Sequence, residues 1–232
     1  MNNVYSKGLP YRSQVMISGV MTSATLLTVP AGSVLAFSYA VGDALSGSAG
    51  FPASWGNATY AQTNLQQPRV TNGENFLIKG IQIKPTSDSE AEILRGIYDD
   101  SDVSLEVEGG TRTVHLGPLS DIPGGNGLFG SFQSRLRPGI NSRIGAVSFG
   151  NSGMPKGGPD SMFKIPNGFK WAQGNAADSQ MVCRITTTKT FTVVIPVARV
   201  VSATGDAYDP PTTAGDLGTY ARLSVRLIGE PY

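Results

Sequence analysis

The sequence predicts an all-β protein, a jelly-roll (Greek-key) β-sandwich of about 8–12 strands with long Gly/Pro-rich loops and at most one short helix. Short segments in which apolar and polar residues alternate recur along the chain, as half-buried strands require. The chain also holds 29 glycines and 15 prolines in 232 residues, the density of turns that many short strands need. We expect an N-terminal arm over residues 1–12 and one jelly-roll domain over 13–232; the alternative is two small jelly rolls that divide near 118–140.

Composition narrows the class of protein. The formal net charge is +1, so the chain lacks the cations that condense nucleic acid, and no sequence-specific nucleic-acid binding is predicted. Charged residues make up 15% of the chain, against about 25% in ordinary soluble domains. Because a solitary molecule with so few charges would expose much uncharged surface, burial in an assembly is the favoured explanation.

Cysteine content and hydropathy indicate the compartment. Cys183 is the single cysteine and cannot form an intrachain disulfide, so an oxidised secreted scaffold is not indicated. The sequence opens without a signal-peptide pattern, and no apolar run approaches the roughly 18 residues of a membrane span. We therefore expect synthesis in a cytoplasm and a soluble chain until assembly.

The N-terminal third is nearly uncharged. After an extended arm with Lys7 and Arg12, the only charged residue from Ser13 to Pro68 is Asp43. Apolar runs punctuated by glycine and proline predict three strands in this region. These strands span residues 14–20, 24–29 and 33–41.

A long segment rich in Gly, Ser, Ala and Asn follows, over residues 42–67, and contains Phe51, Trp55 and Tyr60. In one interpretation it is a flexible loop whose aromatic residues fold onto their own domain. In the other it forms an inter-subunit or membrane-facing surface. The second is favoured, because residues 13–68 form a run of 56 with one charge, which makes a poor solvent-facing surface.

The middle of the chain contains the clearest patterns. A strand is expected over 75–84, then a short helix near 89–96 that ends at Gly96, then an acidic turn over 99–102. Residues that alternate in a period of two on both sides of Gly109-Gly110 predict a β-hairpin with a two-residue turn, in which positive φ is required. The alternating residues are Val103, Leu105 and Val107 before the turn, and Arg112, Val114 and Leu116 after it.

The remainder alternates strands with long loops. Residues 180–188 and 190–200 are expected to be strands paired with each other, while 117–141 and 203–217 are expected to be loops. Alternation of Ala221, Leu223, Val225 and Leu227 with polar residues predicts a final strand. Three further short strands are expected over 144–149, 162–165 and 169–171.

Two motifs in the middle of the chain resemble a known family. Gly80-Ile81-Gln82-Ile83 closes a strand, and the hairpin is followed by Gly117-Pro118-Leu119, Asp121-Ile122-Pro123 and Gly127-Leu128-Phe129-Gly130. This arrangement resembles capsid proteins of tailless icosahedral bacteriophages, many of which contain a membrane. The shells of that family are built from jelly rolls that stand upright on the capsid surface.

The resemblance implies a structural capsid protein that self-assembles into an icosahedral shell through loop and N-terminal-arm contacts. Its implied partners are further copies in capsomers and other capsid or vertex proteins, with an underlying membrane left open. The implied location is the virion, after synthesis in the host cytoplasm. The candidate assembly-interface residues are Lys7, Arg12, Phe51, Trp55, Tyr60, Arg135 and Arg137.

Catalytic chemistry finds little support in the sequence, and no catalytic residue, cofactor or metal site is predicted. His115 is the only histidine, and Cys183 lies on the inward parity of its strand, so neither a hydrolytic triad nor a zinc site is indicated. The acidic turns at 99–102 and at Asp206 and Asp209 match no EF-hand spacing, and calcium binding is left open.

Two other functions remain alternatives. In the first, the chain is a phage spike or lectin-like sandwich that binds host-surface glycans on Trp55, Tyr60 or Trp171. In the second, a sandwich hydrolase uses Glu106 and Glu108, whose spacing puts both carboxylates on one strand face. The favoured explanation is that Glu106 and Glu108 simply lie on the solvent-exposed face of an amphipathic hairpin.

Overall fold

A computed structural model describes the chain over eleven stretches: residues 11–23, 26–45, 47–52, 55–67, 75–86, 89, 91–107, 112–124, 162–171, 180–194 and 220–231. Within them the chain is mostly β-strand, with one α-helix, α1 (Ala91–Asp100), so the all-β prediction is confirmed. The described stretches also include two short 3-10 helices, η1 (Gly47–Ala49) and η4 (Leu119–Asp121). The strands are β1 (Tyr11–Ser18), β2 (Val20–Ser23), β3 (Leu26–Val29), β4 (Gly32–Ala36), β5 (Phe76–Pro85), β6 (Ser101–Val107), β7 (Arg112–Pro118), β8 (Phe163–Trp171), β9 (Met181–Thr187), β10 (Phe191–Val194) and β11 (Tyr220–Pro231).

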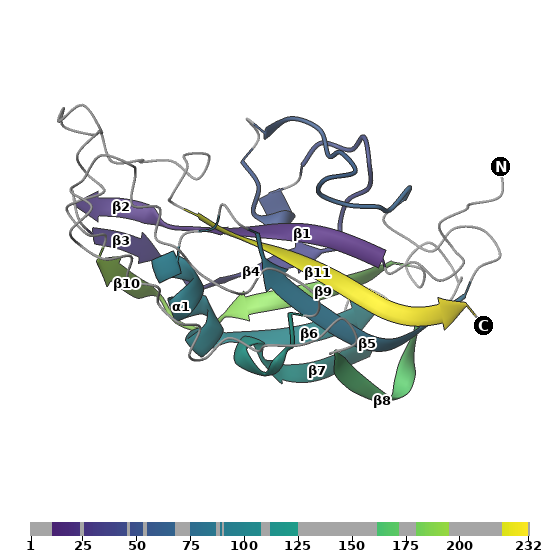
Figure 1. Cartoon of the computed structure of the whole chain (residues 1–232). Coiled ribbons are helices and arrows are strands. Elements are labelled where there is room, and N and C mark those ends of the chain that lie inside the picture. The colour runs from purple at the N-terminus through teal and green to yellow at the C-terminus, as the bar shows by residue number, and fades with distance from the viewer. Residues whose placement is uncertain are drawn as a thin grey trace, which may run out of the picture.

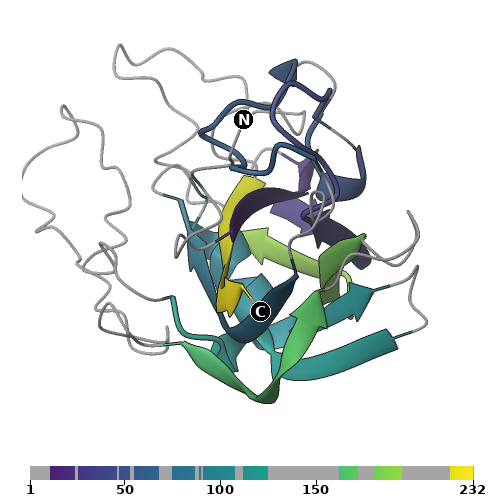
Figure 2. The ribbon, with the colours of Figure 1, turned by 90° about the vertical axis from the view of Figure 1, so that its right-hand side faces the viewer.

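The strands form three antiparallel sheets (Figures 1 and 2). Sheet A has the order β1-β11-β5-β8, and sheet C has the order β4-β9-β6-β7. A smaller sheet, B, has the order β10-β3-β2. Consecutive strands mostly lie in different sheets, so the chain crosses the molecule repeatedly between layers.

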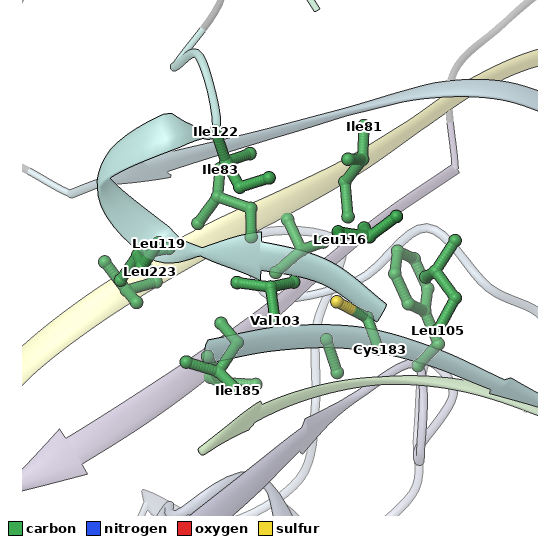
Figure 3. Packing of buried hydrophobic residues seen from close by; sticks show 14 of the residues in the cluster. Ile81, Ile83, Val103, Leu105, Leu116, Leu119, Ile122, Cys183, Ile185 and Leu223 are labelled. Carbon is green, nitrogen blue, oxygen red and sulfur yellow. The ribbon is translucent and has the colours of Figure 1, made fainter. Parts of the chain in front are cut away.

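The main core lies between sheets A and C, and α1 packs its apolar face onto the same cluster. Residues 221, 223, 225 and 227 of β11 are all fully buried, as their alternation predicts. Side chains from β5, such as Ile81 and Ile83, point toward Val103 and Leu105 of β6 in the opposite sheet (Figure 3). The buried faces of the strands are therefore those that the period-two pattern identifies.

The predicted β6–β7 hairpin is confirmed by its pairing. The register joins Val107 to Arg112, which is the register that a two-residue turn at 109–110 would give. That turn itself lies outside the described residues. Near the other end, the register shifts between Val103 and Ser104, and Gly117 adopts a φ of 101°.

The helix is longer than predicted. It passes through Gly96 and ends at Asp100, and Ser101 already belongs to β6, so the expected helix end and acidic turn are both wrong. Gly96 is required by packing: a Cβ there would lie 2.2 Å from the Phe191 ring of β10. A residue that favours helix ends thus serves here as the contact point between helix and sheet.

Several strand predictions are also corrected. The expected 33–41 strand stops at Ala36, because Phe37 turns the chain with a φ of 67°. The two short strands at 162–165 and 169–171 are one strand, β8, which tolerates left-handed conformations at Asn167 and Gly168.

The expected pairing of 180–188 with 190–200 is wrong. Strand β9 pairs with β4 along one edge and β6 along the other, so both of its edges are occupied. Strand β10 pairs with β3 in sheet B instead. The predictions for 144–149, 203–217 and most of 117–141 fall outside the described residues.

Candidate assembly surface

Residues 37–67, here called the outer segment, fold over sheet A with little regular structure. Backbone hydrogen bonds link its two halves: the Val41 N–H donates to the Leu65 carbonyl at 2.9 Å, and the Gly42 N–H donates to the Ala58 carbonyl at 2.8 Å. A backbone bridge joins Ser13 of β1 to Thr63. The described part of the outer segment is thus a hydrogen-bonded layer on its own domain.

A second hydrophobic cluster fixes this layer to sheet A. Phe51 is buried, and its ring lies 5.6 Å from Trp55 and 6.1 Å from Tyr39 between centroids. Trp55 also meets Tyr220 of β11 edge to face, at 5.7 Å. Such aromatic pairs add to the free energy gained by burying their area. The cluster consists of Met16, Tyr39, Leu45, Ala49, Phe51, Ala58 and Tyr220, with Trp55 packed against it.

Tyr39 connects the two layers through polar contacts. Its hydroxyl donates to the Gln14 carbonyl at 2.8 Å and accepts from the Gln14 N–H at 3.2 Å. Burial raises the pKa of the Tyr39 phenol, although hydrogen bonds with Ser13 and Gln14 oppose the change. The phenol is therefore a neutral structural group that ties the outer segment to β1.

The outward surface of the outer segment is almost uncharged. Asp43 is its only charged residue, and its carboxylate accepts the Ala40 N–H at 2.8 Å. The Tyr60 side chain is 52% exposed. Charge depletion is typical of the central area of protein interfaces. The exposed residues are Gly42, Asp43, Ala44, Gly47, Ser48, Gly56, Asn57, Thr59, Tyr60, Ala61, Gln66 and Gln67.

Of the seven candidate interface residues, four lie in the described part of the chain, and all four contact other parts of the same chain. Phe51 packs inside this chain, as the own-domain interpretation has it, and Trp55 is half-buried with the Arg222 guanidinium 5.4 Å from its ring centroid. Arg12 donates to the Tyr60 carbonyl, and its own backbone N–H donates to the Asn64 amide oxygen at 2.6 Å. Lys7, Arg135 and Arg137 lie outside the described residues.

Tyr39 and Arg222 were missed by sequence reasoning. Both are central to the layer: Tyr39 bonds to β1, and Arg222 covers the indole of Trp55. Their roles depend on contacts between distant parts of the chain, and no local pattern in the sequence distinguishes them.

The groups considered for chemistry have structural roles or lie on the surface. Cys183 is fully buried in the core, which raises the pKa of its thiol and disfavours the nucleophilic thiolate. His115 is exposed on β7. Within the described stretches, no group of three or more His, Cys, Asp or Glu side chains is arranged to hold a metal ion.

Glu106 forms a bidentate ion pair with Arg184 on the neighbouring strand. The Arg184 Nε lies 2.6 Å from one carboxylate oxygen, and Nη2 lies 2.9 Å from the other. This hydrogen bonding lowers the pKa of the Glu106 carboxyl. A general acid of a glycosidase needs a raised pKa, so Glu106 is not suited to that one role. Glu108 lies outside the described residues.

Replacing Glu106 with Gln should therefore make folding stability less dependent on pH on the acid side. The folded-state pKa is lowered, so the ion pair stabilises the fold above the unfolded-state pKa and loses this contribution as pH falls through the folded-state pKa. We expect a loss of about 1 kcal/mol at neutral pH that vanishes in acid. Urea unfolding at several pH values measures it; a difference that persists in acid would contradict the assignment.

Comparison with known proteins gives no relative. No family model matches the chain, and neither a curated protein nor a solved structure matches it. Among the described residues, no helix is both long and apolar enough to span a membrane.

Proposed function

We propose that this chain folds as a single jelly roll and serves as a structural capsid protein that assembles into an icosahedral phage shell. The proposal rests on one observation above all: the outer segment forms an ordered, almost uncharged surface on a two-sheet body. The strand order and the positions of the family-like motifs support it.

Strand pairing supports the jelly roll. Eight strands make up the two large sheets, and in chain order they are β1, β4, β5, β6, β7, β8, β9 and β11. The first pairs with the last, the second with the seventh, the third with the sixth and the fourth with the fifth. A long antiparallel ribbon that rolls up produces this nesting, and the β11–β5 and β9–β6 pairs then close the roll.

The same pairing favours one roll over two. Strands that precede residue 118 pair with strands that follow residue 140 in both large sheets, as β5 does with β8 and β6 with β9. A division near 118–140 would separate these partners. We therefore propose one jelly-roll domain, which takes in Tyr11 and Arg12 because both already pair with β11 as part of β1.

The motifs that resemble phage capsid proteins meet in space. The Ile83 N–H donates to the Pro123 carbonyl at 3.1 Å, which joins the β5 motif to the segment after the hairpin. Leu119 and Ile122 of that segment are fully buried beside Ile83 (Figure 3). The described residues of the two motifs thus pack together, as a resemblance in fold requires, while Gly127-Leu128-Phe129-Gly130 lies outside the described residues.

The glycan-binding alternative has less support. Trp171 is fully buried, so it cannot offer a ring face to a sugar. Arg222 covers one face of Trp55, and Tyr60 remains the only exposed ring of the three candidates. One exposed tyrosine is a weak basis for a lectin site, and we propose the shell function instead.

A charge inserted into the outer segment tests the proposal. Ala61→Glu should lower the yield of oligomers or particles at least tenfold, because it buries an unpaired carboxylate at a neighbour contact. Gln180→Glu adds the same charge at an exposed position before β9 and should leave the yield nearly unchanged. Light scattering and electron microscopy of the purified chain measure both.

A wild-type chain that stays monomeric at high concentration would contradict the shell function. So would an Ala61→Glu variant that assembles as well as the wild type. Circular dichroism on both variants would confirm that the fold is retained, which separates lost assembly from lost structure.

A further inference from the structure

Sheet A has a polar outer face beside the outer segment, and cations gather on it. Register places Arg12 of β1 directly opposite Arg226 of β11. On the other side of β11, Lys84 of β5 lies opposite Ser224, one row along from Arg226. Because alternate residues of a strand share a face, these three side chains project from the same surface.

No counter-ion in the described structure balances this cluster. The side chains of Lys84 and Arg226 form no hydrogen bond or ion pair with any described residue, and both residues are half-buried. Burial, then the charges of Arg226 and Arg12, lower the pKa of Lys84. Burial, then Arg12, likewise lowers the pKa of Arg226. The three cations therefore repel one another in a partly desolvated position.

Unsatisfied buried polar atoms lie on the same face. Gln14 is only 8% exposed, follows Arg12 at the next outward position of β1, and its side-chain oxygen is buried without a hydrogen-bond partner. The Nε of Arg12 is also buried without a partner. Leaving a buried polar atom without a hydrogen bond destabilises the folded state. Rotating the Gln14 amide would present its NH2 group as a further donor, since the two orientations are related by a simple flip.

We propose that Arg12, Arg226 and Lys84, with the Gln14 amide, form a binding site for a tetrahedral oxyanion of the phosphate class. Guanidinium groups present paired N–H donors that match the spacing of phosphate oxygens, and an ammonium adds a compact charge. A bound dianion would offset the mutual repulsion and give the Arg12 Nε an acceptor. The site does not depend on the shell function.

Inorganic phosphate is the direct probe, and thermal unfolding of the full chain is the readout. Phosphate titrated to saturation should raise Tm by about 3 °C, since a ligand that binds only the folded state stabilises it. Sodium chloride at the same ionic strength is the control for general screening of the repulsion. Glycerol phosphate, tested alongside, separates a site for the free ion from one that accepts phosphate carried on an organic group.

Two variants make the test specific. Arg226→Met and Lys84→Met should each abolish most of the phosphate response, yet without phosphate neither should melt below the wild type, because each removes a repelling charge. Lys189→Gln removes the same charge from an exposed residue near Asp100 and should keep the full response. An equal Tm rise in chloride, or an unchanged response in both methionine variants, would overturn the proposal.

Discussion

Trp171→Ala is expected to lower the free energy of unfolding by about 3–5 kcal/mol, the usual cost of removing a large buried aromatic side chain. Trp171 is fully buried at the end of β8. Its ring meets Tyr11 of β1 at 5.2 Å and Phe37 at 6.5 Å, both edge to face. The substitution would leave a cavity where β8, β1 and the turn after β4 converge, and close packing prevents its full collapse.

Urea unfolding monitored by circular dichroism measures this loss, and Trp55→Ala is the matched control. Trp55 is half-buried in the cluster beneath the outer segment, so its removal should cost about 1–2 kcal/mol. Equal losses for the two tryptophans would contradict the placement of Trp171 in the main core. That result would also make Trp171 a candidate for an exposed ring that binds a glycan.

Much of the fold could be predicted from local patterns. The strands whose apolar residues alternate, such as β6, β9 and β11, are found where the pattern predicts them, because one face of each is buried. The β9–β10 pairing could not be predicted in this way. Adjacent strands usually pair, and nothing local reveals that β9 has neighbours on both edges from distant parts of the chain.

The candidate sites depend even more on distant contacts. The scarcity of charge in residues 13–68 predicts an interface, but the folding of residues 37–67 onto β1 rests on pairs such as Arg12 with Asn64, which are 52 positions apart. The oxyanion site is a stronger case. Arg12, Lys84 and Arg226 are scattered over most of the sequence, and only the register of β1, β11 and β5 brings them together.

The way in which the outer segment meets β1 leads to a sharper prediction at Gly50. This residue has a φ of 81°, and a Cβ added there would lie 1.8 Å from the Met16 carbonyl oxygen. Because that oxygen belongs to the backbone of β1, no side-chain adjustment can make room. Gly50→Ala is therefore expected to lower the free energy of unfolding by at least about 2 kcal/mol. The left-handed conformation is strained for alanine, and the added Cβ forces the outer segment away from β1.

Gly56→Ala is the control that separates these two causes. Gly56 also has a positive φ, 71°, but no atom lies within 4 Å of the position of its Cβ. Gly56→Ala should lower the free energy of unfolding by only about 1 kcal/mol, which is the effect of the backbone conformation alone. Hydrogen exchange at the Val41, Gly42 and Leu45 amides, which bond within the outer segment, should quicken strongly in Gly50→Ala and little in Gly56→Ala.

The same pair of variants connects the outer segment to assembly. If the surface of residues 37–67 forms the contacts between copies, Gly50→Ala should lose particles while far-UV circular dichroism still reports the two large sheets. Gly56→Ala should still assemble. Should both variants exchange and assemble alike, the outer segment would not be held by its approach to Met16, and the ordered surface on which the shell function rests would have to be abandoned.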